Sequence, residues 1–201
     1  MENRCEWAQK TEIMAKYHDE EWGMPLHDDQ KLFEFLILEG MQAGLSWSTI
    51  LNKREAFRLA YENFDAMKVA CFDRQKVEEL MSNSAIIRNR QKILASINNA
   101  RLFLEIVHEF GSFDRYIWNF VDHKPIVNKW EKLAELPAKT ELSDIISADL
   151  KRRGFKFVGS TIVYAHMQAT GMVNDHLVNC FCHPENKKRI DYVIYPFSKP
   201  N

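Results

Sequence analysis

Cysteine and histidine occur together near both ends of this chain, and that pairing is the strongest constraint on how it can fold. Cys5 and His18 lie near the start, and His176 and Cys180 lie near the end with i, i+4 spacing. On a helix, this spacing places both side chains on one face. Two thiolates and two imidazoles form a closed tetrahedral set for zinc, so one metal ion would join the two ends of the chain. The alternative is two unrelated pairs, because a free cysteine is often only a small buried residue.

The remaining cysteines and histidines leave this ligand set open. Cys182 and His183 are close enough to Cys180 to replace one ligand. Cys71 lies in an apolar stretch and is predicted to belong to the core. The sequence contains no Cys-x-x-Cys pair, which makes a redox or metal-storage role a remote alternative.

Composition is typical of a globular chain. With 201 residues, of which 46% are hydrophobic, one domain or two small lobes are expected. No apolar run approaches the length of a membrane span, and the first residues lack the apolar core of a signal peptide. Four cysteines do not resemble a disulfide framework. We therefore expect a cytoplasmic protein without a membrane segment, and a monomer without a protein partner.

The balance of charge neither requires nor excludes nucleic acid. The net charge is −1, which argues against a basic coat over the whole surface. A local basic face needs only a few cations, and two clusters qualify, at 88–92 and at 151–156. Solvated helix ends are the more common explanation of such clusters.

Helical periodicity dominates the sequence and predicts an all-α fold. The segment from Asp28 to about Met41 is apolar on nearly every side, which predicts a buried helix. Further helices are expected over 11–22, 46–63, 86 or 88–110 and 113–121, with short ones capped by Asp65 and Asp73. Residues 123–140 are expected to form a loop, because they contain two prolines.

Two more helices, over 143–153 and 160–170, are predicted to form a unit with the connector between them. Ser143 is expected to cap the first helix. The connector contains Gly154, Lys156 and Gly159. Glycine permits positive φ and close backbone approach, and the amides at the start of a helix suit a phosphate. The unit, about residues 143–171, is therefore interpreted as a helix-hairpin-helix, with an ordinary corner between helices as an equal alternative.

A carboxylate and several aromatic residues indicate a binding pocket. Glu39 ends the apolar helix, and a buried carboxylate is unfavourable unless it is paired or functional. Tryptophan and tyrosine rings beside a carboxylate would receive a flat cation, although most aromatic residues belong to a core. The candidates are Trp7, Tyr17, Trp22 and Trp47. The loop that follows Glu39 carries Gln42, Gly44 and Leu45, where an exposed leucine would serve either as a wedge or as ordinary packing.

Five stretches, taken together, resemble one family over about residues 4–183. They are Arg4–Trp7, Tyr17–Gly23, Leu38–Trp47, Lys151–Gly159 and Gly171–His176. In this combination and order they are similar to bacterial 3-methyladenine DNA glycosylase I, the Tag family. The resemblance implies a helix-hairpin-helix DNA glycosylase fold, with two helical lobes and a zinc site that joins the N- and C-terminal segments. It covers a single domain over 1–188, and a loosely attached tail is expected over 189–201.

The same resemblance implies an activity. The chain would flip 3-methyladenine out of alkylated double-stranded DNA and hydrolyse its N-glycosidic bond, as a monofunctional enzyme of base excision repair that leaves an abasic site. The implied roles are a catalytic Glu39, base contacts from Tyr17 and Trp47, and a pocket wall of Trp7 and Trp22. Gln42, Gly44 and Leu45 would probe the gap in the duplex, and the connector with Gly154, Lys156 and Gly159 would hold the backbone. Cys5, His18, His176 and Cys180 would hold one structural zinc.

Two positions qualify the resemblance. Met14 stands where related sequences can carry an aromatic pocket residue. Asp175 is the carboxylate nearest to the hairpin, but it adjoins His176 and is expected to support that ligand rather than to act in catalysis.

Two other functions remain open from the sequence. One is a glycosylase for a different lesion, such as 3-methylguanine. The other is a non-catalytic DNA-binding module that is stabilised by a structural zinc. Glu39 separates the enzyme from the module, because a protein that only binds DNA has no need of a buried carboxylate among tryptophans.

Overall fold

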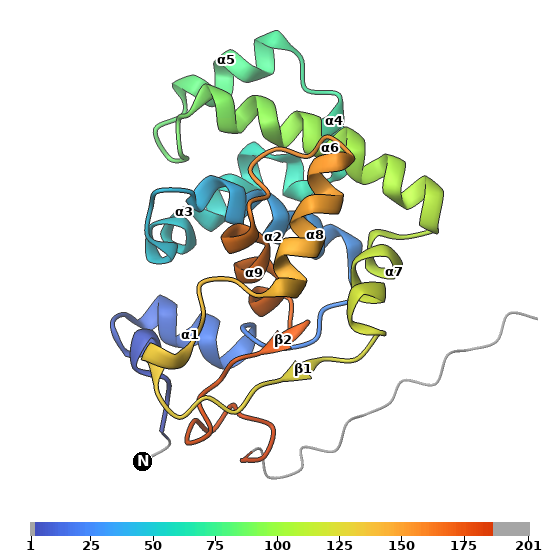
Figure 1. Cartoon of the computed structure of the whole chain (residues 1–201). Helices are drawn as coiled ribbons and strands as arrows, with labels where there is room; N and C mark the ends of the chain where they lie inside the picture. The colour runs from blue at the N-terminus through green and yellow to red at the C-terminus, as the bar shows by residue number, and fades with distance from the viewer. Residues whose placement is uncertain (1–2, 187–201) are drawn as a thin grey trace, which may run out of the picture.

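The computed structural model describes residues 3–186, and these are mostly helical (Figure 1). The α-helices are α1 (Glu12–Glu20), α2 (Asp29–Gln42), α3 (Trp47–Ala60), α4 (Ala66–Ala70), α5 (Arg74–Ser82), α6 (Arg90–Phe110), α7 (Phe113–Trp118), α8 (Glu141–Arg152) and α9 (Ser160–Ala169). The shorter elements are the 3-10 helices η1 (Glu6–Gln9), η2 (Glu62–Phe64), η3 (Asn119–Val121) and η4 (Leu133–Glu135), and the strands β1 (Ile126–Val127) and β2 (Val173–Asn174). Within this part of the chain, no helix is long and apolar enough to cross a membrane. The tail expected at 189–201 lies outside the described residues.

Side-chain caps begin the predicted helices. A backbone N–H in the first turn of α2, α3, α4 and α5 donates to the side chain of Asp28, Ser46, Asp65 and Asp73, respectively. Asn89 caps α6 in the same way, so this helix begins at Arg90, slightly later than predicted. Its end at Gly111 is as expected, because this glycine takes a φ of 86°.

The cap of α8 differs from the prediction. The side chain of Thr140, not that of Ser143, is the N-cap, and it accepts a hydrogen bond from the Ser143 N–H at 3.2 Å. The Ser143 hydroxyl in turn accepts from the Thr140 N–H at 2.9 Å. This is a capping box, in which the second hydroxyl residue stands one turn inside the helix. The prediction of Ser143 as the N-cap is therefore wrong, and the helix begins at Glu141.

Residues 123–140 are mostly loop, as expected, but they include η4 and the strand β1, which pairs in parallel with β2 in the register Ile126↔Val173 and Val127↔Asn174. Two residues are too few to show the alternation that identifies a strand. Cys71 is exposed rather than buried, because it follows the end of α4 instead of lying on its packed face.

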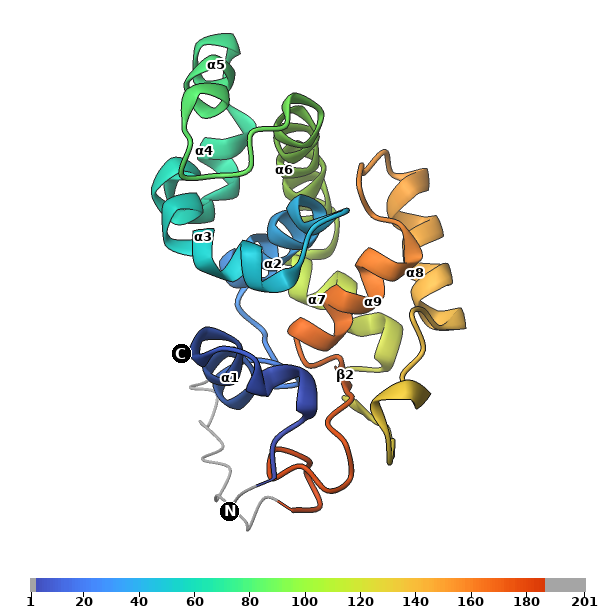
Figure 2. The same cartoon turned by 90° about the vertical axis from the view of Figure 1, so that its left-hand side faces the viewer.

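Helix α2 lies at the centre of the molecule (Figure 1) and packs against α3, α6, α7 and α9. Its buried side chains lie on all sides of the helix, as its apolar sequence predicts: Leu32, Phe33, Phe35, Leu36, Ile37, Leu38 and Met41. In Figure 2, α8 and α9 lie side by side, next to α2 and α6. The last turn of α2 is therefore surrounded by the segments in which the candidate site residues lie.

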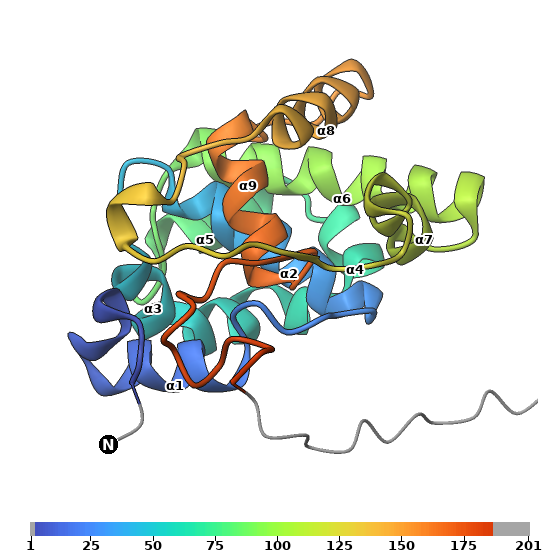
Figure 3. The same cartoon turned by 60° about the horizontal axis from the view of Figure 1, so that its bottom comes forward.

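The two ends of the described chain meet below α2 (Figure 3). The Phe181 N–H donates to the Asn3 carbonyl at 2.9 Å. The segment after α1 is joined to the end of α9 by hydrogen bonds from the N–H of Gly23 to the carbonyl of Gln168 (2.8 Å) and from the N–H of Leu26 to the carbonyl of Thr170 (3.0 Å). These contacts bring residues far apart in sequence to one place.

Gly171 provides a test of this close packing. It ends α9 at a φ of 69°, and a Cβ there would overlap the backbone of Met24 and Pro25. We expect Gly171→Ala to destabilise the protein by about 3 kcal/mol, because positive φ and overpacking act together. Gly44→Ala is the control, since Gly44 has a φ of 80° but faces open space and should lose only about 1–2 kcal/mol. Urea unfolding of both variants measures the difference, and equal losses would contradict the close contact.

Candidate active site

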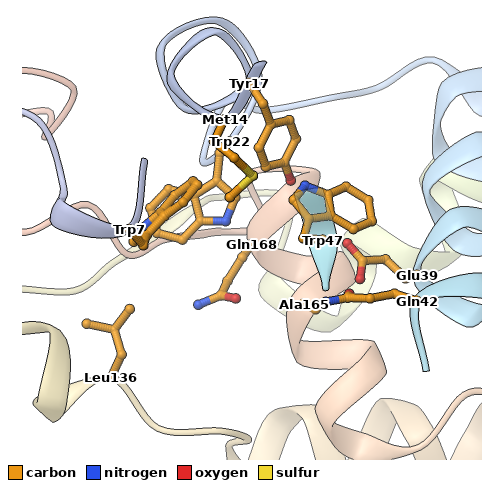
Figure 4. A pocket seen from close by; sticks show the side chains of 10 residues that line it. All are labelled: Trp7, Met14, Tyr17, Trp22, Glu39, Gln42, Trp47, Leu136, Ala165 and Gln168. Carbon is orange, nitrogen blue, oxygen red and sulfur yellow. The ribbon is translucent and has the colours of Figure 1, made fainter. Parts of the chain in front are cut away.

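A pocket of about 240 Å³ opens beside the last turn of α2 (Figure 4). It is lined by Trp7, Met14, Tyr17, Trp22, Glu39, Gln42, Trp47, Leu136, Ala165 and Gln168. Its walls come from η1, α1, α2, α3 and α9, so no short segment of the chain could form it alone. Its size suits a small molecule or one chemical group of a larger ligand.

The structure brings the four predicted aromatic residues together in this pocket. Trp7 and Trp22 meet edge to face with ring centroids 4.9 Å apart, and Tyr17 and Trp47 lie 5.4 Å apart. Met14 also lines the pocket, so this position contributes a flexible thioether in place of a ring. The arrangement offers several aromatic faces to a flat ligand.

Glu39 is the unusual group of the pocket. It is 2% exposed, and its Oε2 has no hydrogen-bond donor among the described residues. Burial raises the pKa of Glu39 to about 8. A buried polar atom without a partner is rare in folded proteins and calls for an explanation, and a ligand that brings a donor or a positive charge would supply the missing partner.

Other polar groups point to the same place. The Nε1 of Trp47 is also buried and makes no well-formed hydrogen bond among the described residues, although it lies beside the Tyr17 hydroxyl. Burial, followed by the nearby charge of Glu39, raises the pKa of Tyr17 well above its usual value, so its hydroxyl stays neutral. The pocket therefore presents an acceptor at Glu39, a donor at Trp47 and a neutral hydroxyl at Tyr17.

A tight turn joins α2 to α3 at the mouth of the pocket. The Leu45 N–H donates to the Gln42 carbonyl at 2.6 Å, and the backbone at Ala43 (φ −42°, ψ 113°) and Gly44 (φ 80°) forms a type II β-turn. Leu45 is 41% exposed, while Gln42 lines the pocket. We call residues 42–45 the 42–45 turn. This turn places the apolar side chain of Leu45 in solvent next to the cavity.

The two predicted helices are present as α8 and α9, and the two glycines of the connector between them, the candidate hairpin, differ. Gly154 has a φ of 100° and needs to be glycine, whereas Gly159 has a φ of −64° and faces open space. Gly159 is the N-cap of α9 and provides no capping side chain, which leaves the first amides of α9 available to a ligand. Lys156 is exposed.

The basic cluster before this hairpin is largely neutralised. Arg153 pairs with Glu109 at 2.7 Å and with Asp149 at 2.9 Å, and Arg152 also pairs with Asp149. The sequence prediction of a basic face here applies mainly to the exposed Lys151 and Lys156.

The four predicted metal ligands lie together and are all buried. His176 Nδ1 is 3.8 Å from Cys5 Sγ, 3.6 Å from Cys180 Sγ and 3.1 Å from His18 Nε2. Cys180 Sγ is 3.4 Å from His18 Nε2. Tetrahedral zinc with ordinary bond lengths separates sulfur from nitrogen by about 3.6 Å and nitrogen from nitrogen by about 3.3 Å. The donor set therefore has the dimensions of a metal site.

Hydrogen bonds behind the two histidines support this assignment. His18 Nδ1 lies 2.7 Å from a carboxylate oxygen of Asp19, which Arg4 holds with two hydrogen bonds. His176 Nε2 lies 2.9 Å from the carbonyl oxygen of Trp22. Because both partners accept, each ring donates outward, and the two inward nitrogens face each other as bare acceptors at 3.1 Å. A cation between them would relieve this repulsion, as in metal sites where an outer acceptor orients each histidine.

Arg4 and Asp19 were missed as site residues from the sequence. Their positions in the sequence were the available signal, because Arg4 directly precedes Cys5 and Asp19 directly follows His18. Residues 175–180 are not helical, with irregular backbone at 175–177 and a turn at 178–179, so the two side chains come together without the helical geometry that the i, i+4 spacing would allow.

The alternative ligands lie outside the group of four. Cys182 Sγ is 3.9 Å from His18 Nδ1, on the outward side of that ring. His183 Nε2 is 3.1 Å from the Asn128 carbonyl. Neither side chain reaches the space between the inward nitrogens.

Asp175 has a structural environment. Its carboxylate is 1% exposed and accepts four hydrogen bonds, from the side chains of Asn128 (2.7 Å), Trp130 (2.7 Å), Tyr164 (2.5 Å) and Gln168 (2.7 Å). These bonds join the 123–140 segment to α9. Asp175 was predicted to support His176. Its carboxylate instead accepts a hydrogen bond from Gln168, whose side chain lines the pocket.

Comparisons with known proteins agree on one family. The family model described as methyladenine glycosylase matches residues 7–183. DNA-3-methyladenine glycosylase 1 from Escherichia coli strain K12 is 49% identical over 92% of this chain and 98% of its own. A crystal structure of 3-methyladenine DNA glycosylase I superposes with a TM-score of 0.88 at 47% identity, over 90% of this chain and 100% of the other. A variant of 3-methyladenine DNA glycosylase I in complex with 3-methyladenine gives 0.87 at 36% identity, over 90% and 98%.

The unpaired carboxyl of Glu39 predicts an unusual dependence of stability on pH. Its pKa is about 8 in the folded protein and 4.5 for a free side chain. Between these values the folded state keeps a proton that the unfolded state has lost, so the free energy of unfolding falls as pH rises. Glu39→Gln removes this pH-dependent contribution to the free energy of unfolding. We expect the free energy of unfolding of the variant, relative to that of the wild type, to rise by about 1.4 kcal/mol per pH unit between pH 4.5 and about pH 8 and to level off at higher pH.

Urea unfolding of both proteins from pH 5 to pH 9 measures this difference. Two stability curves that run parallel over the whole range would show that Glu39 is solvated or paired in the folded state.

Proposed function

The chain belongs to the methyladenine glycosylase family, and we infer that it is a DNA-3-methyladenine glycosylase. It removes 3-methyladenine from alkylated DNA by hydrolysing the N-glycosidic bond and leaves an abasic site for base excision repair. The observation that carries this inference is the unpaired, buried carboxyl of Glu39 inside an aromatic pocket. A module that only binds DNA would gain nothing from it.

The chemistry of the substrate suits this pocket. Methylation at N3 gives adenine a positive charge, which weakens its bond to the sugar and makes it a good leaving group without protonation. As the bond breaks, its electron pair passes to the base and cancels the charge, while water adds to the sugar carbon and releases a proton. The enzyme therefore has to recognise and position the base more than it has to activate it.

Each pocket residue has a role in this recognition. Glu39 accepts hydrogen bonds from the nitrogen edge of the base, and its negative charge complements that of the cation. Trp47 stacks on the base and Tyr17 shapes the pocket. Trp7 and Trp22 form the outer wall. Asp175 does not act as a general base in this proposal, because its carboxylate already accepts four hydrogen bonds.

DNA is held by two segments near the pocket. The target base must leave the stack before it can enter the site. We propose that Gln42, Gly44 and Leu45 occupy the gap that it leaves, and that Gly154, Lys156 and Gly159 hold the phosphate backbone as a helix-hairpin-helix. In this proposal a single domain over 1–188 forms two helical lobes, and it acts as a monomer on double-stranded DNA in the cytoplasm.

We propose that the buried Cys5, His18, His176 and Cys180 hold one structural zinc. All four positions come from the protein, which leaves no open position for water or substrate. When bound, zinc would supply folding energy by joining the N-terminal segment to the segment after β2.

Release of the methylated base tests the central residue. Wild-type protein should release 3-methyladenine from methylated duplex DNA, and Glu39→Gln should release it about 100-fold more slowly, because a buried charged hydrogen bond is worth several kcal/mol. Chromatography of the freed bases measures both rates. Glu12→Gln is the control, since Glu12 is exposed on α1 and should leave the rate unchanged. Equal release by the Glu39 variant would refute the assignment.

A second prediction concerns the metal. Cys180→Ser should lose bound zinc and lower the melting temperature by about 10 °C or more. Structural zinc contributes several kcal/mol to stability, and each kcal/mol shifts the melting temperature of a chain of this size by about 2–4 °C. Cys71→Ser is the control, because Cys71 is exposed. Elemental analysis and thermal unfolding with and without a chelator give the readouts. A chelated wild type that keeps its melting temperature would contradict a structural zinc.

A further inference from the structure

The basic cluster at 88–92 lies mostly on an exposed helix start, as its sequence suggests, but Lys92 is buried and does not belong to that face. Arg90 is paired with Glu78 at 2.7 Å. Lys92 is only 8% exposed, and its Nζ donates to the backbone carbonyls of Met41 at 2.8 Å and Ala43 at 2.7 Å. Burial lowers the pKa of Lys92, and the side chain is directed into the protein rather than toward phosphate.

The two carbonyls that Lys92 binds are at the end of α2. The last carbonyls of a helix have no partner within the helix, and a cation there is also favoured by the helix dipole. The Ala43 carbonyl belongs to the 42–45 turn. Lys92 therefore fixes the backbone from which Leu45 projects, and it does so from outside the turn itself.

The same helix holds the hairpin. Asn99, two turns after Lys92 on the same face of α6, pairs with both backbone groups of Lys156: its Nδ2 donates to the carbonyl at 2.8 Å, and its Oδ1 accepts from the N–H at 2.9 Å. Asn98 adds a hydrogen bond from its Nδ2 to the Gly154 carbonyl at 3.1 Å. Figure 2 shows the α2–α3 connection and the α8–α9 connector on the side of the molecule where α6 lies.

We propose that Lys92 is a positioning residue, which holds the 42–45 turn at a fixed distance from the hairpin so that Leu45 enters the duplex when the hairpin grips its backbone. This inference rests on the proposed function. A turn that moved freely would have to be ordered each time DNA binds, and a displacement of about 1 Å at such a contact can reduce a rate by about 100-fold. Because Lys92 holds the 42–45 turn against α6, the turn is already ordered before DNA binds.

The test replaces Lys92 with methionine, which keeps the length of the side chain and removes its donors. We expect Lys92→Met to lower kcat/KM on methylated duplex DNA by about tenfold or more, while its affinity for free 3-methyladenine, followed by tryptophan fluorescence, stays close to that of the wild type. Arg101→Met is the matched control. Arg101 lies on the same helix and donates to the end of α4, at the Ala70 carbonyl, away from the turn, and its loss should not affect base release from duplex DNA.

A double-mutant cycle separates positioning from general destabilisation. If Lys92 acts through Leu45, the double variant Lys92→Met with Leu45→Ala should be about as slow as Leu45→Ala alone. Full additivity of the two losses, an unchanged rate for Lys92→Met, or an equal fall in free-base affinity would each overturn the inference. If the methionine variant does not fold, Lys92→Gln replaces it, and its amide should give a smaller loss because it reaches only one carbonyl. Absence of base release by the wild type would instead reject the proposed function.

Discussion

The structure depends on the burial of α2 along its whole length. Because this helix is apolar on nearly every side, it packs against α3, α6, α7 and α9 at once, and its last turn has a fixed position relative to all of them. Glu39 enters the pocket from that turn, and the 42–45 turn follows directly. The α8–α9 connector reaches the same turn at Gly40, where an added Cβ would make an ordinary contact with Phe157 Cβ at 3.5 Å. The pocket, the 42–45 turn and the α8–α9 connector therefore all adjoin the last turn of α2.

The metal cluster and the pocket wall form one packed unit. Trp7 lies edge to face with His18 at 5.3 Å, and Trp22 lies edge to face with His176 at 4.7 Å. The carbonyl of Trp22 also receives the outer hydrogen bond of His176. Two tryptophans of the wall thus touch the two imidazole ligands directly. A structural metal here would shape the pocket without taking any part in the chemistry, because it would restrict where these rings can lie.

The parts of this structure that could be predicted from sequence are those that depend on local or chemical signals. Asp28, Ser46 and Asp73 identify helix starts because their side chains act within one turn, and cysteine with histidine identifies a candidate metal site by donor type alone. Features made by contacts across the fold gave no such signal. Lys92 is a cation in a basic cluster until α2 is placed beside it, and the four donors to Asp175 come from two distant segments. The strand pair of β1 and β2 is too short to leave a pattern.

Under the proposed function, burial of Glu39 gives the pocket a way to prefer a charged base over a neutral one. In the empty pocket, burial holds the pKa of Glu39 at about 8, so near neutral pH most of the carboxyl groups are protonated. A protonated carboxyl offers a donor and has no charge to attract a cation. A cationic base that displaces this proton gains the full attraction of a carboxylate in a medium of low dielectric constant. A neutral adenine gains no such attraction and would have to share the pocket with the proton. Burial of Glu39 therefore favours a ligand that carries positive charge, because such a ligand can replace the proton as the partner of the carboxyl group.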